Sequence, residues 1–154
     1  MITDLNRKLS EHFQLWEFVT SQTAQRKGID NTPTEQIITH LEYLCATVLE
    51  PARKALGSLM ISSGYRCPEL NMSVGGSATS AHTIGFAADI IPKQASKMDF
   101  AKWVVKNTKF DQVILEFGKI NDPAWIHVSA DPRNRKQVLR ILTGTGYKNF
   151  KFGE

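Results

Sequence analysis

Three side chains with metal-binding donor atoms, far apart along the chain, place the strongest constraint on how this sequence folds. His82 and Asp89 share the segment 80–89, and His127 follows much later in the run 125–129. Two imidazoles and one carboxylate are a ligand set suited to a catalytic zinc ion, which takes three protein ligands and leaves a fourth position to water. A fold that uses these residues together must bring both segments to one point.

Helical patterns come first along the chain. Residues 10–28 are predicted to be helical in part. Apolar residues then recur at helical spacing from Ile37 to Leu49, behind Thr32 or Thr34 as the N-cap. Pro51 is expected to kink this helix or to restart it as a second segment that ends near Gly57.

Strand-like patterns dominate the rest of the chain. They cover the ranges 60–63, 86–91, 112–117, 125–130 and 137–143, with one amphipathic helix predicted over 98–107 and a tail at 149–154 that is expected to fray. Helices followed by clustered strands indicate an α+β fold with N-terminal helices packed on a mainly antiparallel sheet. The length of 154 residues suits a single domain over 1–154.

Composition excludes several classes of protein. Hydrophobic residues make up 42% and charged residues 22%, which is ordinary for a globular protein, and no apolar run approaches the length of a membrane span. The first residues lack the apolar segment of a signal peptide, so we expect synthesis in the cytoplasm. Cys45 and Cys67 are too few for a disulfide framework. Cys45 is interpreted as a core residue, and nothing around Cys67 indicates a thiol protease.

Alternation along the run 125–129 predicts that His127 is available to a metal site. Ile126 and Val128 fall on one strand face, which we assign to the core, so His127 lies on the opposite face. The other two histidines, His12 and His40, lie in helical stretches and are interpreted as surface or partly buried residues.

A longer pattern surrounds the three candidate ligands and makes them specific. It consists of Ser63-Gly64-Tyr65-Arg66, Asn71, Gly75-Gly76, Ser80-x-His82-x-x-Gly85-x-Ala87-x-Asp89 and Trp125-x-His127. Together these elements resemble the zinc D-alanyl-D-alanine carboxypeptidases, whose fold is shared with hedgehog signalling domains and D-alanyl-D-alanine dipeptidases. The resemblance runs from about Phe13 to about Ser129 and is closest to the short single-domain branch of phages and bacteria. It implies that fold, and a zinc ion held by His82, Asp89 and His127.

The resemblance also implies two residues that face the substrate. Arg66 matches an arginine that stabilises negative charge near the reacting carbonyl or a terminal carboxylate, a task suited to a permanently charged, bidentate guanidinium. The alternative is a structural ion pair with a local acid such as Glu69. Ser80 matches a serine at the substrate cleft, and its alternative role is that of a turn or cap hydroxyl.

Glu116 is the candidate general base, the carboxylate that takes a proton from water and delivers it to the leaving amine. If 112–117 and 125–130 pair as a hairpin, Glu116 and His127 lie on neighbouring strands and on one face. The small phage-like branch resembles this chain at Glu116. In the dipeptidase branch the glutamate lies three residues before the third ligand, where this chain has Ala124, and Asp122 is the competing base.

The function predicted from these residues is zinc-dependent hydrolysis of peptide bonds in peptidoglycan stem peptides by a monomer, with no membrane or nucleic acid as partner. A protein without a signal peptide would reach the cell wall after release, as a phage lysin does, or on a particle. The bond cleaved stays open between D-Ala-D-Ala carboxypeptidase and L-Ala-D-Glu endopeptidase activity. The alternative is a zinc-stabilised, non-catalytic module that binds cell wall or protein. The net charge of +4 suggests nucleic-acid binding, but aromatic residues are not interleaved with the basic residues around 133–148.

Overall fold

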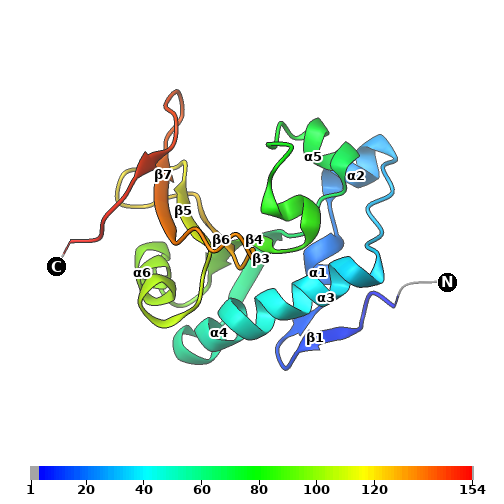
Figure 1. Cartoon of the computed structure of the whole chain (residues 1–154), viewed down its shortest axis with the longest axis horizontal. Helices are drawn as coiled ribbons and strands as arrows, with labels where there is room; N and C mark the ends of the chain where they lie inside the picture. The colour runs from blue at the N-terminus through cyan, green and yellow to red at the C-terminus, as the bar shows by residue number, and fades with distance from the viewer. Residues whose placement is uncertain (1–3, 154) are drawn as a thin grey trace.

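The computed structural model, which describes residues 4–153, shows a six-stranded sheet with helices packed on one of its faces (Figure 1). The strands are β3 (Leu59–Ser63), β4 (Ala87–Pro92), β5 (Gln112–Glu116), β6 (Trp125–Ser129), β7 (Gln137–Ile141) and β8 (Lys148–Asn149). They lie in the order β3-β4-β6-β5-β7-β8, and the pairs are antiparallel except for β5 and β7, which are parallel. The predicted α+β class with a mainly antiparallel sheet is confirmed.

The remaining elements precede the sheet in the chain or connect its strands. They are β1 (Lys8–Ser10), β2 (Phe13–Gln14), α1 (Trp16–Val19), α2 (Gln22–Lys27), α3 (Glu35–Leu44), the π-helical η1 (Cys45–Leu49), α4 (Glu50–Leu56), α5 (Pro68–Ser73), the 3₁₀ turn η2 (Ala81–Ile84) and α6 (Lys97–Asn107). None of the helices within residues 4–153 combines the length and the apolar character needed to cross a bilayer.

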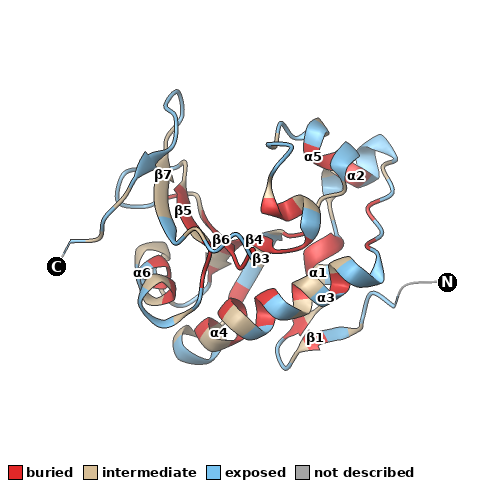
Figure 2. Cartoon of the chain, in the orientation of Figure 1, coloured by how far each residue is buried: buried red, intermediate tan, exposed pale blue. Residues whose placement is uncertain are grey.

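The main core lies between the helices and one face of the sheet, as the buried segments of Figure 2 show. Alternate residues of the central strands point into it. The strand residues are Ala88, Ile90, Val113, Leu115, Ile126 and Val128. The helices contribute residues such as Leu41, Leu44, Phe100 and Val104. The strand alternation expected for Ile126 and Val128 is therefore observed, and the opposite face of the sheet is left for polar residues.

The long helix begins and ends where the sequence predicts. The Thr34 side chain accepts a hydrogen bond from the Ile37 amide, and the helical path ends at Gly57. Ahead of Pro51 the helix widens into η1, where the Glu50 amide bonds to the Cys45 carbonyl five residues earlier. A widened turn accommodates the missing proline N–H without a sharp break.

Three short elements differ from the prediction. Residues 10–28 are helical in part, as predicted, since α1 and α2 lie there, but the small β1–β2 hairpin that precedes them was not predicted. A buried carboxylate explains the hairpin, because Glu50 accepts hydrogen bonds from the Ser10 hydroxyl, the His12 amide and the His12 ring. Helix α5 lies between the strands predicted over 60–63 and 86–91, where no helix was predicted, and β8 includes Asn149 of the expected frayed tail. Elements this short leave no periodic pattern to detect.

Candidate metal centre

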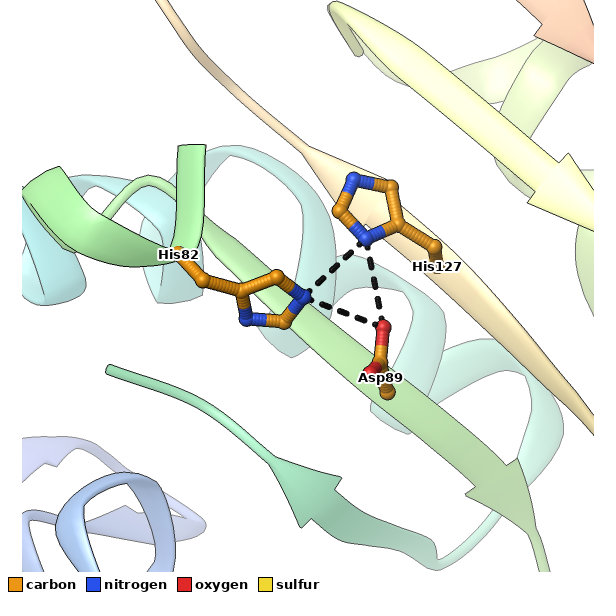
Figure 3. Close-up of side chains that lie close together, drawn as sticks. All are labelled: His82, Asp89 and His127. Carbon is orange, nitrogen blue, oxygen red and sulfur yellow. Dashed lines mark hydrogen bonds and ion pairs between the residues drawn. The ribbon is translucent and has the colours of Figure 1, made fainter. Parts of the chain in front are cut away.

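Two of the three candidate ligands are directly opposite each other on paired strands. Asp89 of β4 and His127 of β6 are register partners, and both side chains leave the sheet on the face opposite the core. His82 reaches the same point from η2 (Figure 3). His127 Nδ1 lies 3.2 Å from both His82 Nε2 and Asp89 Oδ1, and His82 Nε2 lies 3.3 Å from Asp89 Oδ1.

This triangle of donor atoms fits a zinc ion. A tetrahedral ion with bonds of about 2.0–2.1 Å holds its donors about 3.3 Å apart, close to the separations observed here. All three residues are buried, and a buried polar cluster without a shared proton or ion is costly. The His-Asp-His group could therefore hold a metal ion, with two ring nitrogens and one carboxylate oxygen as its ligands.

The orientation of His82 is fixed by the backbone. Its Nδ1 lies 2.6 Å from the Gly64 carbonyl oxygen, so Nδ1–H donates and Nε2 keeps a lone pair for a metal. Gly64 cannot carry a side chain, because a Cβ there would lie 2.5 Å from the Phe18 carbonyl oxygen. This contact explains why a glycine stands in the Ser-Gly-Tyr-Arg run.

The turn η2, which carries His82, is capped at both ends, by Ser80 and by Gly85. Ser80 Oγ accepts from the His82 amide at 3.2 Å, and the backbone turns at Gly85 with φ +79°. A Cβ on Gly85 would lie 2.9 Å from the Ile37 carbonyl oxygen of α3, so only glycine combines this turn with this packing. The segment 80–89 therefore gives a rigid path from one ligand to the next.

Electrostatics keep Asp89 ready to bind a cation. Burial opposes its ionisation, but interaction with the His82 and His127 rings holds the pKa of Asp89 well below its ordinary range. The carboxylate is therefore ionised at neutral pH, as a metal ligand must be.

The three candidate ligands lie in a cavity of about 710 Å³. Its floor is the polar face of β4, β5 and β6, and the glycine- and serine-rich segment 74–81 forms one wall. Residues of β7 and the loop before β8 contribute Leu139 and Tyr147. A substrate can therefore approach the three ligands from the open side of the sheet.

Glu116 lies in this cavity and Asp122 does not. Glu116 is opposite Trp125 across the β5–β6 pair, and its Oε2 accepts a hydrogen bond from the Trp125 indole at 2.8 Å. Burial and then the negative charge of Asp89 raise the pKa of Glu116, while His127 partly opposes the shift. Asp122 instead forms an exposed ion pair with Lys97 at 2.8 Å, outside the cavity lining.

A comparison with protein-family models matches residues 11–129 to the peptidase M15 model. The chain belongs to the peptidase M15 family. This is the zinc D-Ala-D-Ala carboxypeptidase family that the sequence pattern resembles, so that resemblance is confirmed. A comparison with curated proteins gives no match. Family membership supports a zinc metallopeptidase, and the matched range includes all three candidate ligands and Glu116.

In this M15 chain Arg66 does not form the structural ion pair with Glu69 that was the alternative to a substrate-facing role. Within residues 4–153 no carboxylate pairs with its guanidinium, so the alternative partner Glu69 is not used. Its Nε is buried and has no hydrogen-bond partner, although Arg66 lines the cavity. Burial lowers the pKa of Arg66, and the nearby charges of Asp89 and Glu116 oppose that shift. An unpaired buried donor beside a cavity is suited to a substrate oxygen.

Ser80 in the M15 site has the role of a cap and also lines the cavity. Cys67 does not line the cavity, and its thiol accepts a hydrogen bond from the Leu70 amide at the start of α5. Cys45 is a fully buried core residue, as expected, and burial raises the pKa of its thiol. His40 packs its ring against Phe86 at 4.0 Å, away from the three ligands.

The sequence did not predict the role of Asp111, a buried acid that binds Arg135. Asp111 accepts hydrogen bonds from the Arg135 backbone amide and guanidinium and from the Ser129 hydroxyl. Arg133 pairs with Asp131 and also donates to the Thr79 carbonyl, which links the turn after β6 to the wall of the cavity. The alternating pattern of β6 places Ser129 on the face of His127, but nothing in the sequence pairs it with Asp111.

Proposed function

We propose that this chain is a zinc-dependent peptidase that hydrolyses peptide bonds in peptidoglycan stem peptides. The observation that carries the proposal is the set of three donor atoms, 3.2–3.3 Å apart, at the floor of a cavity that also contains Glu116 and Arg66. A metal site alone would serve structure, but structural zinc sites are closed by four protein ligands. Here three ligands meet beside open space.

His82, Asp89 and His127 would hold the ion. When bound there, zinc supplies a Lewis acid that lowers the pKa of a water molecule and polarises a scissile carbonyl. The Gly64 carbonyl fixes the tautomer of His82 for this purpose. The net charge of the three ligands is −1, which leaves a positive centre to attract the carbonyl oxygen of a substrate.

Glu116 is the proposed proton carrier. The pKa of Glu116 is raised toward neutral pH, and a group whose pKa lies near the working pH can both take up and release a proton. The Trp125 indole holds one carboxylate oxygen and leaves the other for water or for the leaving amine. Glu116 would take a proton from water as that water attacks the peptide carbonyl, and would then deliver it to the departing nitrogen.

Arg66 is the proposed partner for negative charge on the substrate. Arg66 lines the cavity, and within residues 4–153 no carboxylate pairs with its guanidinium, which leaves this group available for a substrate oxygen. A carbonyl oxygen that becomes negative, or a carboxylate of the stem peptide, meets this requirement. Both D-Ala-D-Ala carboxypeptidase and L-Ala-D-Glu endopeptidase activity are compatible with this arrangement.

The proposed site of action is the bacterial cell wall, reached after release from the cytoplasm, as for a phage lysin. The protein is proposed to act there as a monomer. No part of the proposal requires a membrane or a nucleic acid.

The test uses zinc-loaded protein and a synthetic stem pentapeptide, L-Ala-D-Glu-L-Lys-D-Ala-D-Ala, with products identified by mass spectrometry. Loss of one alanine, or cleavage after the first alanine, supports the proposal and names the bond. Glu116→Gln should keep zinc and lose most turnover, and Asp122→Asn is the matched control that should keep both. Folded, zinc-loaded wild type that cleaves neither this peptide nor purified cell wall would contradict the proposal and favour a binding module.

A further inference from the structure

One wall of the cavity lies outside the segment matched by the M15 family model, which ends at residue 129. Leu139 of β7 and Tyr147, in the loop between β7 and β8, line the same cavity as the three candidate ligands. Figure 1 shows β7 beside β5, with the loop that follows it extending beyond the sheet. The C-terminal part of this chain therefore adds its own residues to the site.

The hairpin that carries Tyr147 has a defined shape. At its tip, the Thr145 amide donates to the Leu142 carbonyl, and the Thr145 hydroxyl accepts from the Leu142 amide at 3.0 Å. At its base, the Phe150 amide donates to Val138, and the Arg140 guanidinium lies 4.6 Å from the centre of the Phe150 ring. These contacts hold the backbone on both sides of Tyr147.

The side chain of Tyr147 is not used by the fold. Tyr147 is 61% exposed, whereas Tyr65 is 8% exposed and packs against the main core. No hydrogen bond joins its hydroxyl to any group in residues 4–153. A large aromatic residue that a structured hairpin presents to a cavity, with a free hydroxyl, is suited to contact a ligand.

The neighbours of this hydroxyl favour its role as a donor. Burial raises the pKa of Tyr147, and the negative charges of Glu116 and Asp89 add to the shift, so the phenol stays protonated at neutral pH. Arg66, with its unpartnered Nε, is close enough for its charge to act on the same group. A neutral hydroxyl donor and a guanidinium in one cavity form a suitable pair for a carboxylate.

We propose that Tyr147 is a substrate-binding residue of this enzyme, which packs its ring against the bound peptide and donates its hydroxyl hydrogen to a peptide carboxylate shared with Arg66. This inference rests on the proposed function and deepens it. It makes the substrate an anionic peptide and gives the hairpin between β7 and β8 a part in selecting it.

The first test compares the wild type with Tyr147→Phe, which keeps the ring, on the stem pentapeptide and on the same peptide with every carboxylate amidated. On the acid peptide, kcat/KM should fall about tenfold, the effect of one hydrogen bond to a charged group. On the amidated peptide, whose carbonyl oxygens still accept a hydrogen bond but carry no charge, the fall should be clearly smaller. Tyr43→Phe is the matched control, because Tyr43 is 50% exposed but lies outside this cavity. Equal kcat/KM for wild type and Tyr147→Phe on the acid peptide would overturn the proposal.

The second test does not need turnover. The chain has three tyrosines, so protein labelled with 3-fluorotyrosine gives few ¹⁹F resonances, and Tyr147→Phe assigns one of them. Adding the stem pentapeptide to zinc-loaded Glu116→Gln protein should shift the Tyr147 resonance and leave that of Tyr43 unchanged. An unchanged Tyr147 resonance at saturating peptide would overturn the proposal. A wild type that cleaves no peptide while the resonance shifts would instead remove the proposed hydrolysis and keep the binding role.

Discussion

The two faces of the central sheet differ in what their residues do. On the helix-facing side, alternate positions such as Ile126 and Val128 are fully buried in the main core. On the other side, the positions between them include Asp89, His127 and Glu116, which meet at the cavity. The alternation of side chains along the same strands thus places core residues on one face and the cavity residues on the other.

This difference shows how a small domain holds buried charge. Placing Asp89 and two imidazoles within 3.3 Å costs desolvation energy, which apolar burial on the opposite face must offset. Because the strands are fixed by packing, the donor atoms stay in place without relying on one another. Changes on the packed face should therefore lower stability, and changes on the cavity face should lower metal affinity or turnover.

The largest effect is expected from the packed face. Ile126→Ala removes a fully buried side chain and should lower the free energy of unfolding by about 2–5 kcal/mol. Urea denaturation of the metal-free protein measures it. Ile114→Ala, on the cavity face of the adjacent strand, is the matched control and should cost less, because Ile114 lines the cavity and is not part of the main core cluster. Equal losses for the two variants would contradict the division between the faces.

The next largest effect is expected on the cavity face, where a substitution should lower zinc affinity rather than stability. His127→Ala should weaken zinc binding by more than about 100-fold, since even groups that only orient the ligands are worth about 10- to 100-fold. The free energy of unfolding of the metal-free protein should change by less than about 1 kcal/mol, because no apolar core contact is lost. A competition assay with a chromogenic chelator gives the zinc affinity. Unchanged affinity would remove His127 from the ligand set.

Gly64→Ala should lower both the stability and the zinc affinity, each to a smaller degree than the two substitutions above. The added Cβ meets the Phe18 carbonyl oxygen at 2.5 Å, so the backbone must shift, at a cost of about 1–3 kcal/mol in stability. The same shift moves the Gly64 carbonyl away from His82 and should weaken zinc binding about tenfold. Gly153→Ala, where a Cβ would meet nothing, is the control. A variant with wild-type zinc affinity would show that Gly64 does not orient His82.

The smallest effect is a change of stability with pH. The folded-state pKa of Glu116 is raised, chiefly by burial, so its ionised form costs free energy in the folded protein above the pKa of the unfolded chain. Glu116→Gln should therefore stabilise the metal-free protein at neutral pH, and the gain should disappear once acid protonates Glu116 in both states. Thermal unfolding from pH 7 to pH 4 measures the difference. A gain that grows toward low pH would have the wrong sign.

Much of the site could be predicted because its parts follow local patterns. Alternation in 125–129 places His127 opposite the core, and the pairing of β5 with β6 brings Glu116 to the same face. The cap at Thr34 and the helix end at Gly57 are also local features. Such features depend on a few neighbouring residues, which is why sequence alone is sufficient to find them.

Contacts between distant segments could not be predicted. The Gly64 carbonyl behind His82, the acid Asp111 beneath Arg135 and the approach of Tyr147 to the cavity depend on backbone positions far apart in the chain. The hairpin β1–β2 was missed for the same reason, because the buried Glu50 that bonds to it comes some forty residues later. Long-range hydrogen bonds leave no periodic trace in the sequence.

Crystallography of zinc-loaded protein, with data collected above and below the zinc absorption edge, tests the central claim most directly. We predict one strong anomalous peak bonded to His82 Nε2, Asp89 Oδ1 and His127 Nδ1, with its free side toward Glu116 in the cavity. A peak at other residues, or none at this triangle in fully zinc-loaded protein, would contradict the account.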